Sequence, residues 1–183
     1  DGGDQSRAML HSIQRLSSEI KRSLWEPSSS RLVITASHVT TSDAIAAVQS
    51  DSAKRLGQML LLNAIRHKTE WKDKNLESEL FDTCSDGRTR LLTKENFSEV
   101  AYATTRMLHA WKIPAHIGNG AYIDGSYTSH FPTGFLTELK CERIICISAE
   151  KEKAFTNIFM QEEIPSQIDG VPVDIIKPDI DLK

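Results

Sequence analysis

The stretch from Gly118 to Ser148 constrains the fold of this chain more than any other. A short apolar run, Ala121 to Ile123, ends at an Asp-Gly pair, and Pro132 then begins a segment with helical spacing. A second apolar run, Ile144 to Ile147, follows that segment. The order indicates a strand, helix, strand unit, and because the connection is short we expect a compact parallel pair of strands.

Similar patterns elsewhere extend this unit to a whole fold. Apolar residues recur at steps of three and four from Asp4 to Leu24, which predicts an amphipathic helix that ends before Pro27. Leu32 to Ala36 is typical of a buried strand, and Val171 to Ile175 predicts a last strand. We also expect helical structure over 40–71, 94–111 and 151–160, and loop and edge structure over 72–93. The alternation predicts an α/β fold: a three-layer, sandwich-like arrangement of a mostly parallel sheet with helices on both faces.

The composition excludes disordered, collagen-like, coiled-coil and disulfide-scaffold proteins. The chain has 183 residues and a mass of 20.5 kDa, with 39% hydrophobic and 26% charged residues, which is ordinary for one globular domain. Its formal net charge of -3 provides no broad attraction to nucleic acid, so we expect no nucleic-acid partner.

Cysteine and histidine spacing indicates no metal site and no cofactor. The three cysteines form no C-x-x-C pair and are interpreted as reduced thiols, and the six histidines form no H-x-x-x-H or H-E-x-x-H pair. The longest strongly apolar stretch, Met59 to Leu62, is far short of a membrane span and could lie in a core helix or touch lipid. With no signal pattern at its start, the chain is expected to be cytoplasmic or peripheral to a membrane.

Asp124 is the strongest candidate for chemistry. It follows a predicted strand, and reactive groups in open parallel sheets collect at the carboxyl ends of strands. Gly125 allows the backbone to turn sharply there, but an Asp-Gly pair also occurs as a plain turn, and spacing alone does not separate the two interpretations. Arg106 could contact a phosphate head group, or be solvated or paired with a carboxylate.

The segment from Tyr122 to Pro132, YIDGSYTSHFP, resembles the C-terminal signature of patatin-like phospholipases. In that family an aromatic and an aliphatic residue precede Asp-Gly, and an Asn-x-Pro follows. Three further stretches are similar to the family's neighbouring elements, so the resemblance covers most of the chain from about Arg31 onward. These stretches are Leu32 to Thr41, Val100 to Trp111 with Pro114, and Leu139 to Ser148.

The resemblance implies a lipid acyl hydrolase that uses a Ser-Asp dyad, with Asp124 as the general base and no metal or cofactor. Gly125, Ser126, His130 and Pro132 would form the active-site loop. The substrate would be a lipid or small ester, with transient contact to a membrane surface. Burial can raise the pKa of a carboxylate enough for it to accept a serine proton directly, and backbone N–H groups of a glycine-rich loop would hold the oxyanion.

The sequence departs from the family pattern at the nucleophile, because it contains no G-x-S-x-G elbow. The opening Asp1, Gly2 and Gly3 echoes the family's glycine-rich loop but has no strand before it, and we interpret it as a tail. His130 stands where Asn is usual, and Ser126 where Gly or Ala is usual. Ser126 is a poor substitute nucleophile, because a serine two residues from its base would have to fold back across its own turn.

Two interpretations of the whole chain follow. In the first, the chain is the C-terminal part of a patatin-like domain, with an N-terminal helix over 1–27 and an α/β portion over 31–178, and the nucleophile lies in residues outside it or in a second polypeptide. In the second, 1–183 is a single domain that serves as a non-catalytic binding or scaffold module. The sequence does not indicate which ester is cleaved, or the oligomeric state.

Overall fold

The computed structural model describes residues 6–20, 22–26, 30–84, 87–149, 151, 154–159 and 163–180. Its helices are α1 (Ser6–Ile20), α2 (Ser42–Gln49), α3 (Ala53–Ile65), α4 (Glu70–Asn75), α5 (Phe97–Ala103), the 3-10 turn η1 (Gly125–Tyr127) and α6 (Thr133–Glu138). Its strands are β1 (Val33–Val39), β2 (Leu76–Asp82), β3 (Arg90–Leu91), β4 (Ala115–Ile117), β5 (Gly120–Ile123), β6 (Ile144–Ile147), β7 (Gln167–Ile168) and β8 (Val171–Ile176). Among the described helices, none combines the length and apolar character needed to cross a bilayer.

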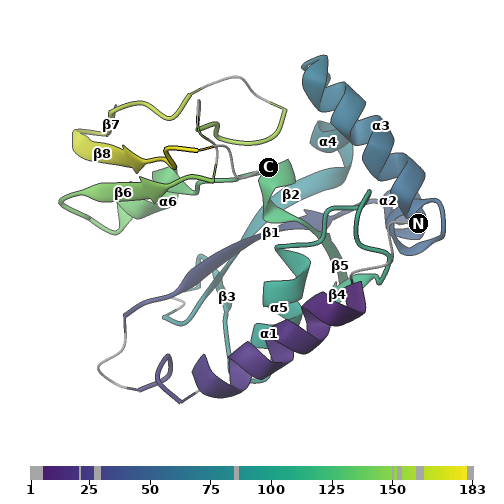
Figure 1. Ribbon diagram of the computed structural model, residues 1–183, viewed down its shortest axis with the longest axis horizontal. Coiled ribbons are helices and arrows are strands. Elements are labelled where there is room, and N and C mark those ends of the chain that lie inside the picture. The colour runs from purple at the N-terminus through teal and green to yellow at the C-terminus, as the bar shows by residue number, and fades with distance from the viewer. Residues whose placement is uncertain are drawn as a thin grey trace.

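The main sheet has five strands in the order β3-β2-β1-β5-β4 (Figure 1). β1 lies antiparallel to both β2 and β5, and β4 lies antiparallel to β5, so β2 and β3 form the one parallel pair of this sheet. The fold is therefore of the mixed α/β class, but the expectation of a mostly parallel sheet is wrong. The β-branched run of β1 indicates burial, and burial is equally possible in the centre of a mixed sheet.

Different helices cover the two faces of the main sheet. On one face Ala36, Phe81 and Tyr122 pack with Ile13 of α1 and Val100 of α5. On the other face the side chains of β1 and β5 pack against α2 and α3, with contributions from Val39, Ile123, Val48 and Leu60. Figure 1 shows α1 and α5 on the first side and α3 at the periphery of the molecule. Side chains of helices therefore pack against both faces of this sheet.

A second, three-stranded sheet has the order β6-β8-β7. β6 runs parallel to β8, with Ile144 opposite Val173, and β7 lies antiparallel to β8. The predicted parallel pairing of Ala121–Ile123 with Ile144–Ile147 is wrong, because β5 and β6 belong to different sheets. Both edges of β5 are already occupied by β1 and β4, which leaves no free edge for β6.

Several predicted elements have other bounds or another structure. The helical stretch over 40–71 is three helices, with Ser50 and Ser52 in the first break, where Ser50 Oγ donates to the carbonyl of Ala47. The helix over 94–111 is shorter, since α5 ends at Ala103. The stretch over 72–93, expected as loop and edge structure, contains β2, which pairs with all of β1, and the edge strand β3. Within 151 and 154–159 there is no helix, and Phe155 forms an isolated bridge with Glu163.

Candidate functional site

Asp124 directly follows β5 and is the N-cap residue of η1. Its backbone is held from two sides: its N–H donates to the carbonyl of Arg106 (3.1 Å), and its carbonyl accepts from Ser37 Oγ (2.7 Å). Ser37 is itself buried in β1, opposite Ile123. The placement of Asp124 is therefore set by the central strand of the sheet as well as by its own strand.

Gly125 packs directly against the backbone of β1. A Cβ atom built on Gly125 would lie 2.4 Å from the carbonyl oxygen of Thr35 and 3.2 Å from Thr104 Oγ1. Thr104 Oγ1 donates to the same Thr35 carbonyl (2.6 Å) and lies beside Gly125. Any side chain at this position would push the loop, and Asp124 with it, away from the sheet.

The carboxylate of Asp124 is fixed by the turn that follows it. Oδ1 accepts the backbone N–H of Ser126 (2.8 Å), which is the capping bond of η1. Burial raises the pKa of Asp124, and this effect outweighs the hydrogen bonds from Ser126 and the nearby His130 and His109, all of which lower it. A buried carboxyl with a raised pKa is suited to accept a proton near neutral pH.

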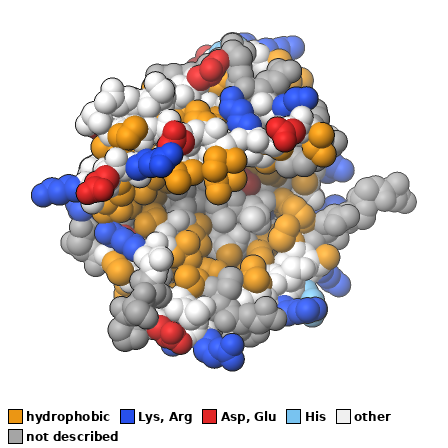
Figure 2. Space-filling model, turned by 60° about the vertical axis from the view of Figure 1, so that its left-hand side comes forward, with side chains coloured by type: hydrophobic (Ala, Val, Ile, Leu, Met, Phe, Trp, Pro, Cys, Tyr) orange, Lys and Arg blue, Asp and Glu red, His pale blue; other side chains and the backbone are white. Residues whose placement is uncertain are grey.

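Asp124 opens into a cavity of about 550 Å³. Its walls come from the first residues of β1, from the segment after α5 and from the loop that starts at Asp124. The lining residues are Val33, Ile34, Thr35, Thr104, Thr105, Met107, Asp124, Gly125, Ser126, Ser129, His130 and Pro132. Figure 2 looks onto the side where the N-terminal end of β1 lies and shows hydrophobic side chains gathered around a recess. The cavity thus combines one carboxylate with apolar walls and several hydroxyls.

His130 and Pro132 line the cavity together with Asp124. The N–H of His130 donates to the carbonyl of Thr156 (2.7 Å), and its ring stacks on Phe131 at 4.7 Å. Pro132 caps α6. The backbone N–H of Ile158 donates to the carbonyl of Ser126 (3.1 Å), so the segment after β6 holds both ends of the loop.

The hydroxyls of the cavity differ in their hydrogen bonds. Thr105 Oγ1 donates to the carbonyl of Tyr102 (2.9 Å), and Ser126 Oγ donates to Met107 Sδ (3.8 Å). For the Ser129 hydroxyl, no hydrogen bond to the described part of the chain is found. Ser126 folds back toward Asp124 through η1: its backbone N–H donates to Oδ1, and a side-chain hydrogen bond from Ser126 also lowers the pKa of Asp124.

A serine nucleophile of this kind would lie between a strand and a helix. Ser42 has such a position, because it follows β1 and is the first residue of α2. β1 and β5 are antiparallel, and Val39 at the end of β1 pairs with Ala121 near the start of β5. Ser42 therefore lies at the opposite end of the sheet from Asp124 and is not its partner. Asp1, Gly2 and Gly3, which echo a glycine-rich loop, lie outside the described residues.

Arg106 is neither solvated nor paired with a carboxylate of the described residues, and its burial leaves it no access to a head group. Its side chain is fully buried, with Nε donating to the carbonyl of Ile113 (2.7 Å) and Nη2 to the carbonyl of Val48 (2.8 Å). Burial lowers the pKa of Arg106, although nearby tyrosines oppose the effect. Arg106 is a structural residue that positions Asp124 through its own backbone carbonyl.

Sequence reasoning missed most of the cavity wall. Val33 and Ile34 appear in the sequence only as a buried strand, and Thr105 and Met107 only as helix residues. The Thr104-Thr105 pair is the one signal that could have indicated a turn here, because two adjacent β-branched residues with hydroxyls favour the end of a helix. Ser37 and the 154–159 segment carry no local signal of their contact with the Asp124 loop.

Among the described residues, no group of three His, Cys, Asp or Glu side chains is placed to hold a metal ion. Comparisons of the chain with protein-family models, with curated proteins and with solved structures found no match. A functional assignment therefore depends on the residues of the site itself.

Proposed function

We propose that this chain carries the general base of a lipid acyl hydrolase of the patatin-like kind. The observation that supports this best is the Asp124 carboxyl: it is held by the Ser126 N–H, its pKa is raised by burial, and it faces a cavity with apolar walls. The nucleophilic serine and the oxyanion loop are assigned to residues outside this chain. We also propose that the fold of this chain has the three-layer arrangement of the patatin-like family, with the sheet between two layers of helices.

In the proposed reaction, Asp124 accepts the proton of the serine hydroxyl while the serine oxygen attacks the ester carbonyl carbon. The tetrahedral intermediate collapses as the bond to the alcohol oxygen breaks, and protonated Asp124 returns the proton to that oxygen. Water then attacks the acyl-serine with Asp124 again as the base, which releases the acid and restores the serine. Oδ1 is engaged by Ser126, so we assign the proton transfers to Oδ2.

The cavity supports an acyl group rather than a polar substrate. Val33, Ile34, Met107 and Pro132 provide aliphatic surface next to the carboxyl. Among the residues that the structure describes, no lysine or arginine lines the cavity, so none of them offers a permanent cation for a phosphate inside it. We therefore infer that the acyl chain enters the cavity and that any charged head group remains outside it.

The proposal is tested on the full protein that contains this chain, with a fluorophosphonate probe and with p-nitrophenyl butyrate. Asp124→Asn should lower kcat by at least about 100-fold with little change in KM, because general-base catalysis contributes about that much or more. The matched control is Asp179→Asn, since Asp179 is exposed and outside the cavity. Turnover by Asp124→Asn at the rate of the control would contradict the proposal, provided that both variants unfold at similar urea concentrations.

The pH profile provides a second test. The base must be ionised to accept a proton, and burial raises the pKa of Asp124. As the pH is lowered, kcat/KM should therefore begin to fall at a pH above the ordinary aspartate pKa of about 4. A profile that is flat down to about pH 4 would argue against Asp124 as the base. If the full protein neither hydrolyses esters nor reacts with the probe, the non-catalytic binding module becomes the better interpretation.

A further inference from the structure

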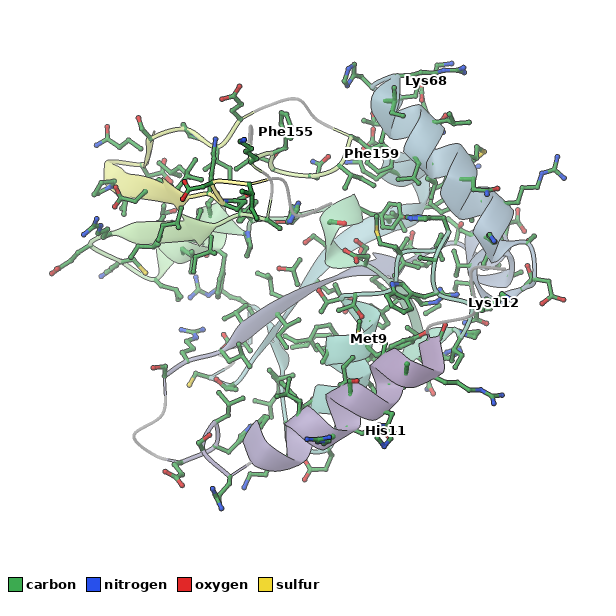
Figure 3. All side chains as sticks on the ribbon, in the orientation of Figure 1. Met9, His11, Lys68, Lys112, Phe155 and Phe159 are labelled. Atoms are coloured by element: carbon green, nitrogen blue, oxygen red, sulfur yellow. The ribbon has the colours of Figure 1, made fainter. Side chains whose placement is uncertain are left out.

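The outer face of α3 exposes aliphatic side chains. Met59, Leu62 and Ile65 are 40%, 54% and 74% exposed, whereas Ala53, Gly57 and Leu60 on the opposite side of the helix are buried. Residues at steps of three and four share one face, so the exposed three form a continuous stripe along the helix. α3 lies at the periphery of the molecule, with Phe159 beneath it and Lys68 at its far end (Figure 3).

The same segment is basic. Between positions 53 and 68 the sequence contains four Lys or Arg residues and no Asp or Glu, although the whole chain has a net charge of -3. The four cations are Lys54, Arg55, Arg66 and Lys68; all are exposed, and none forms an ion pair with the described part of the chain. Asp51 and Glu70 just outside the segment reduce this positive charge without cancelling it.

Arg55 and Arg66 lie on the same side of the helix as the apolar stripe. Arg55, Met59, Leu62 and Arg66 follow one another at steps of four, three and four, which is the spacing of one helix face. Cations therefore stand at both ends of the stripe, about 15 to 20 Å apart at 1.5 Å per residue. Long basic side chains can keep their charge at a polar boundary while neighbouring aliphatic groups enter an apolar phase.

We propose that the outer face of α3, defined by Arg55, Met59, Leu62, Ile65 and Arg66 with Lys54 and Lys68, docks onto an anionic lipid surface. An apolar stripe flanked by cations is the pattern of helices that lie in the membrane interface. The stripe consists of three exposed aliphatic side chains, whereas a stable protein interface involves about 20 to 30 residues on each partner. This docking surface is separate from the Asp124 cavity, and its test does not depend on the proposed hydrolase activity.

The experiment is co-sedimentation of the full protein with vesicles of phosphatidylcholine alone and with vesicles that contain about 30% phosphatidylserine. Binding should occur to the anionic vesicles, weaken with added salt, and be weak or absent with phosphatidylcholine. Each substitution among Lys54→Gln, Arg55→Gln, Arg66→Gln and Lys68→Gln should lower the affinity about fivefold, and Ile65→Gln by a similar factor.

Two matched controls distinguish binding through this surface from nonspecific binding through any exposed apolar or basic side chain. Ile147 of β6 is 74% exposed, the same fraction as Ile65, so Ile147→Gln should leave vesicle binding unchanged. Lys112→Gln removes an exposed cation outside α3 and should also have little effect. Equal losses in Ile147→Gln and Ile65→Gln, or no binding to anionic vesicles, would overturn the proposal. So would a dimer in sedimentation velocity that Leu62→Gln dissociates while vesicles bind nothing.

Discussion

Gly125 lies closer to β1 than any residue with a side chain could. The 2.4 Å separation between a built Cβ and the Thr35 carbonyl oxygen is well inside van der Waals contact, and Thr104 closes the other side. The neighbouring atoms are backbone and a hydrogen-bonded hydroxyl, which have little freedom to move. The loop can therefore pack against β1, with the Asp124 carboxyl at the cavity, only because residue 125 has no Cβ atom.

We expect Gly125→Ala to lower the free energy of unfolding by about 2 kcal/mol, because the added methyl forces the loop off the sheet. Urea unfolding followed by circular dichroism measures this. Gly134→Ala is the matched control: its Cβ would meet no atom within 4 Å, and alanine favours α6, so it should be neutral or slightly stabilising. Equal stability of the two variants would contradict the close contact at Gly125.

At the scale of elements, Arg106 connects the end of one helix to the segment that carries the site. Nη2 donates to the carbonyl of Val48 in the last turn of α2, where the helix leaves carbonyls without partners and its dipole is negative. Nε donates to Ile113, and the Arg106 carbonyl accepts the Asp124 N–H. One buried side chain thus ties α2, the approach to β4 and the end of β5 together.

Arg106→Met should therefore cost about 3 kcal/mol of stability, because the buried Val48 carbonyl loses its side-chain donor and the Ile113 carbonyl keeps only the hydroxyl of Tyr102. Thermal and urea unfolding provide the measurement. Lys112→Met, at an exposed position close by in the chain, should change stability by less than about 0.5 kcal/mol. A loss for Arg106→Met no larger than for this control would show that the side chain does not hold these elements together.

At the scale of the whole molecule, side chains next to the strands of the main sheet contact α6. Arg31, just before β1, binds Asp82 at the end of β2, and its guanidinium lies 5.6 Å from the centre of the Phe135 ring in α6. Arg88 also reaches α6, through an ion pair with Glu138 (2.9 Å). The Asp82 side chain is fully buried, so its pairing matters more than that of an exposed ion pair.

The Asp82 pair predicts how stability depends on pH. Burial alone would raise the pKa of Asp82, but hydrogen bonds from Arg31, the Cys84 N–H and Thr89 together lower it below its usual value. A carboxyl with a lowered pKa stabilises the folded state above its unfolded pKa of about 4, and this stabilisation is lost as the pH falls through the folded pKa.

Asp82→Asn should therefore lower the free energy of unfolding by about 2 kcal/mol at pH 7, and the difference from wild type should shrink as the pH falls below about 4. Urea unfolding at a series of pH values measures both. The control is Asp174→Asn, which breaks an exposed pair with Arg143 and should cost less than about 1 kcal/mol. A difference that stays constant with pH would contradict the role of the Asp82 charge.

Elements with a strong local pattern could be predicted from the sequence. The periodic apolar residues of α1, the β-branched run of β1, the proline before α6 and the alternation in β8 each appear in the structure close to the expected bounds. Asp124 at the end of a strand is also local information, because an apolar run followed by Asp-Gly is a strand that ends in a turn.

By itself, the sequence determined the elements that have a strong local pattern and which carboxyl follows a strand, because periodicity and turn chemistry act within a few residues of the chain. Only the tertiary structure decided which edges pair: β1 lies antiparallel between β2 and β5, and β6 joins another sheet. It also decided that Arg106 is buried and that Val33, Met107 and His130 surround Asp124. These features arise from packing between residues far apart in the chain, and local sequence patterns do not indicate such contacts.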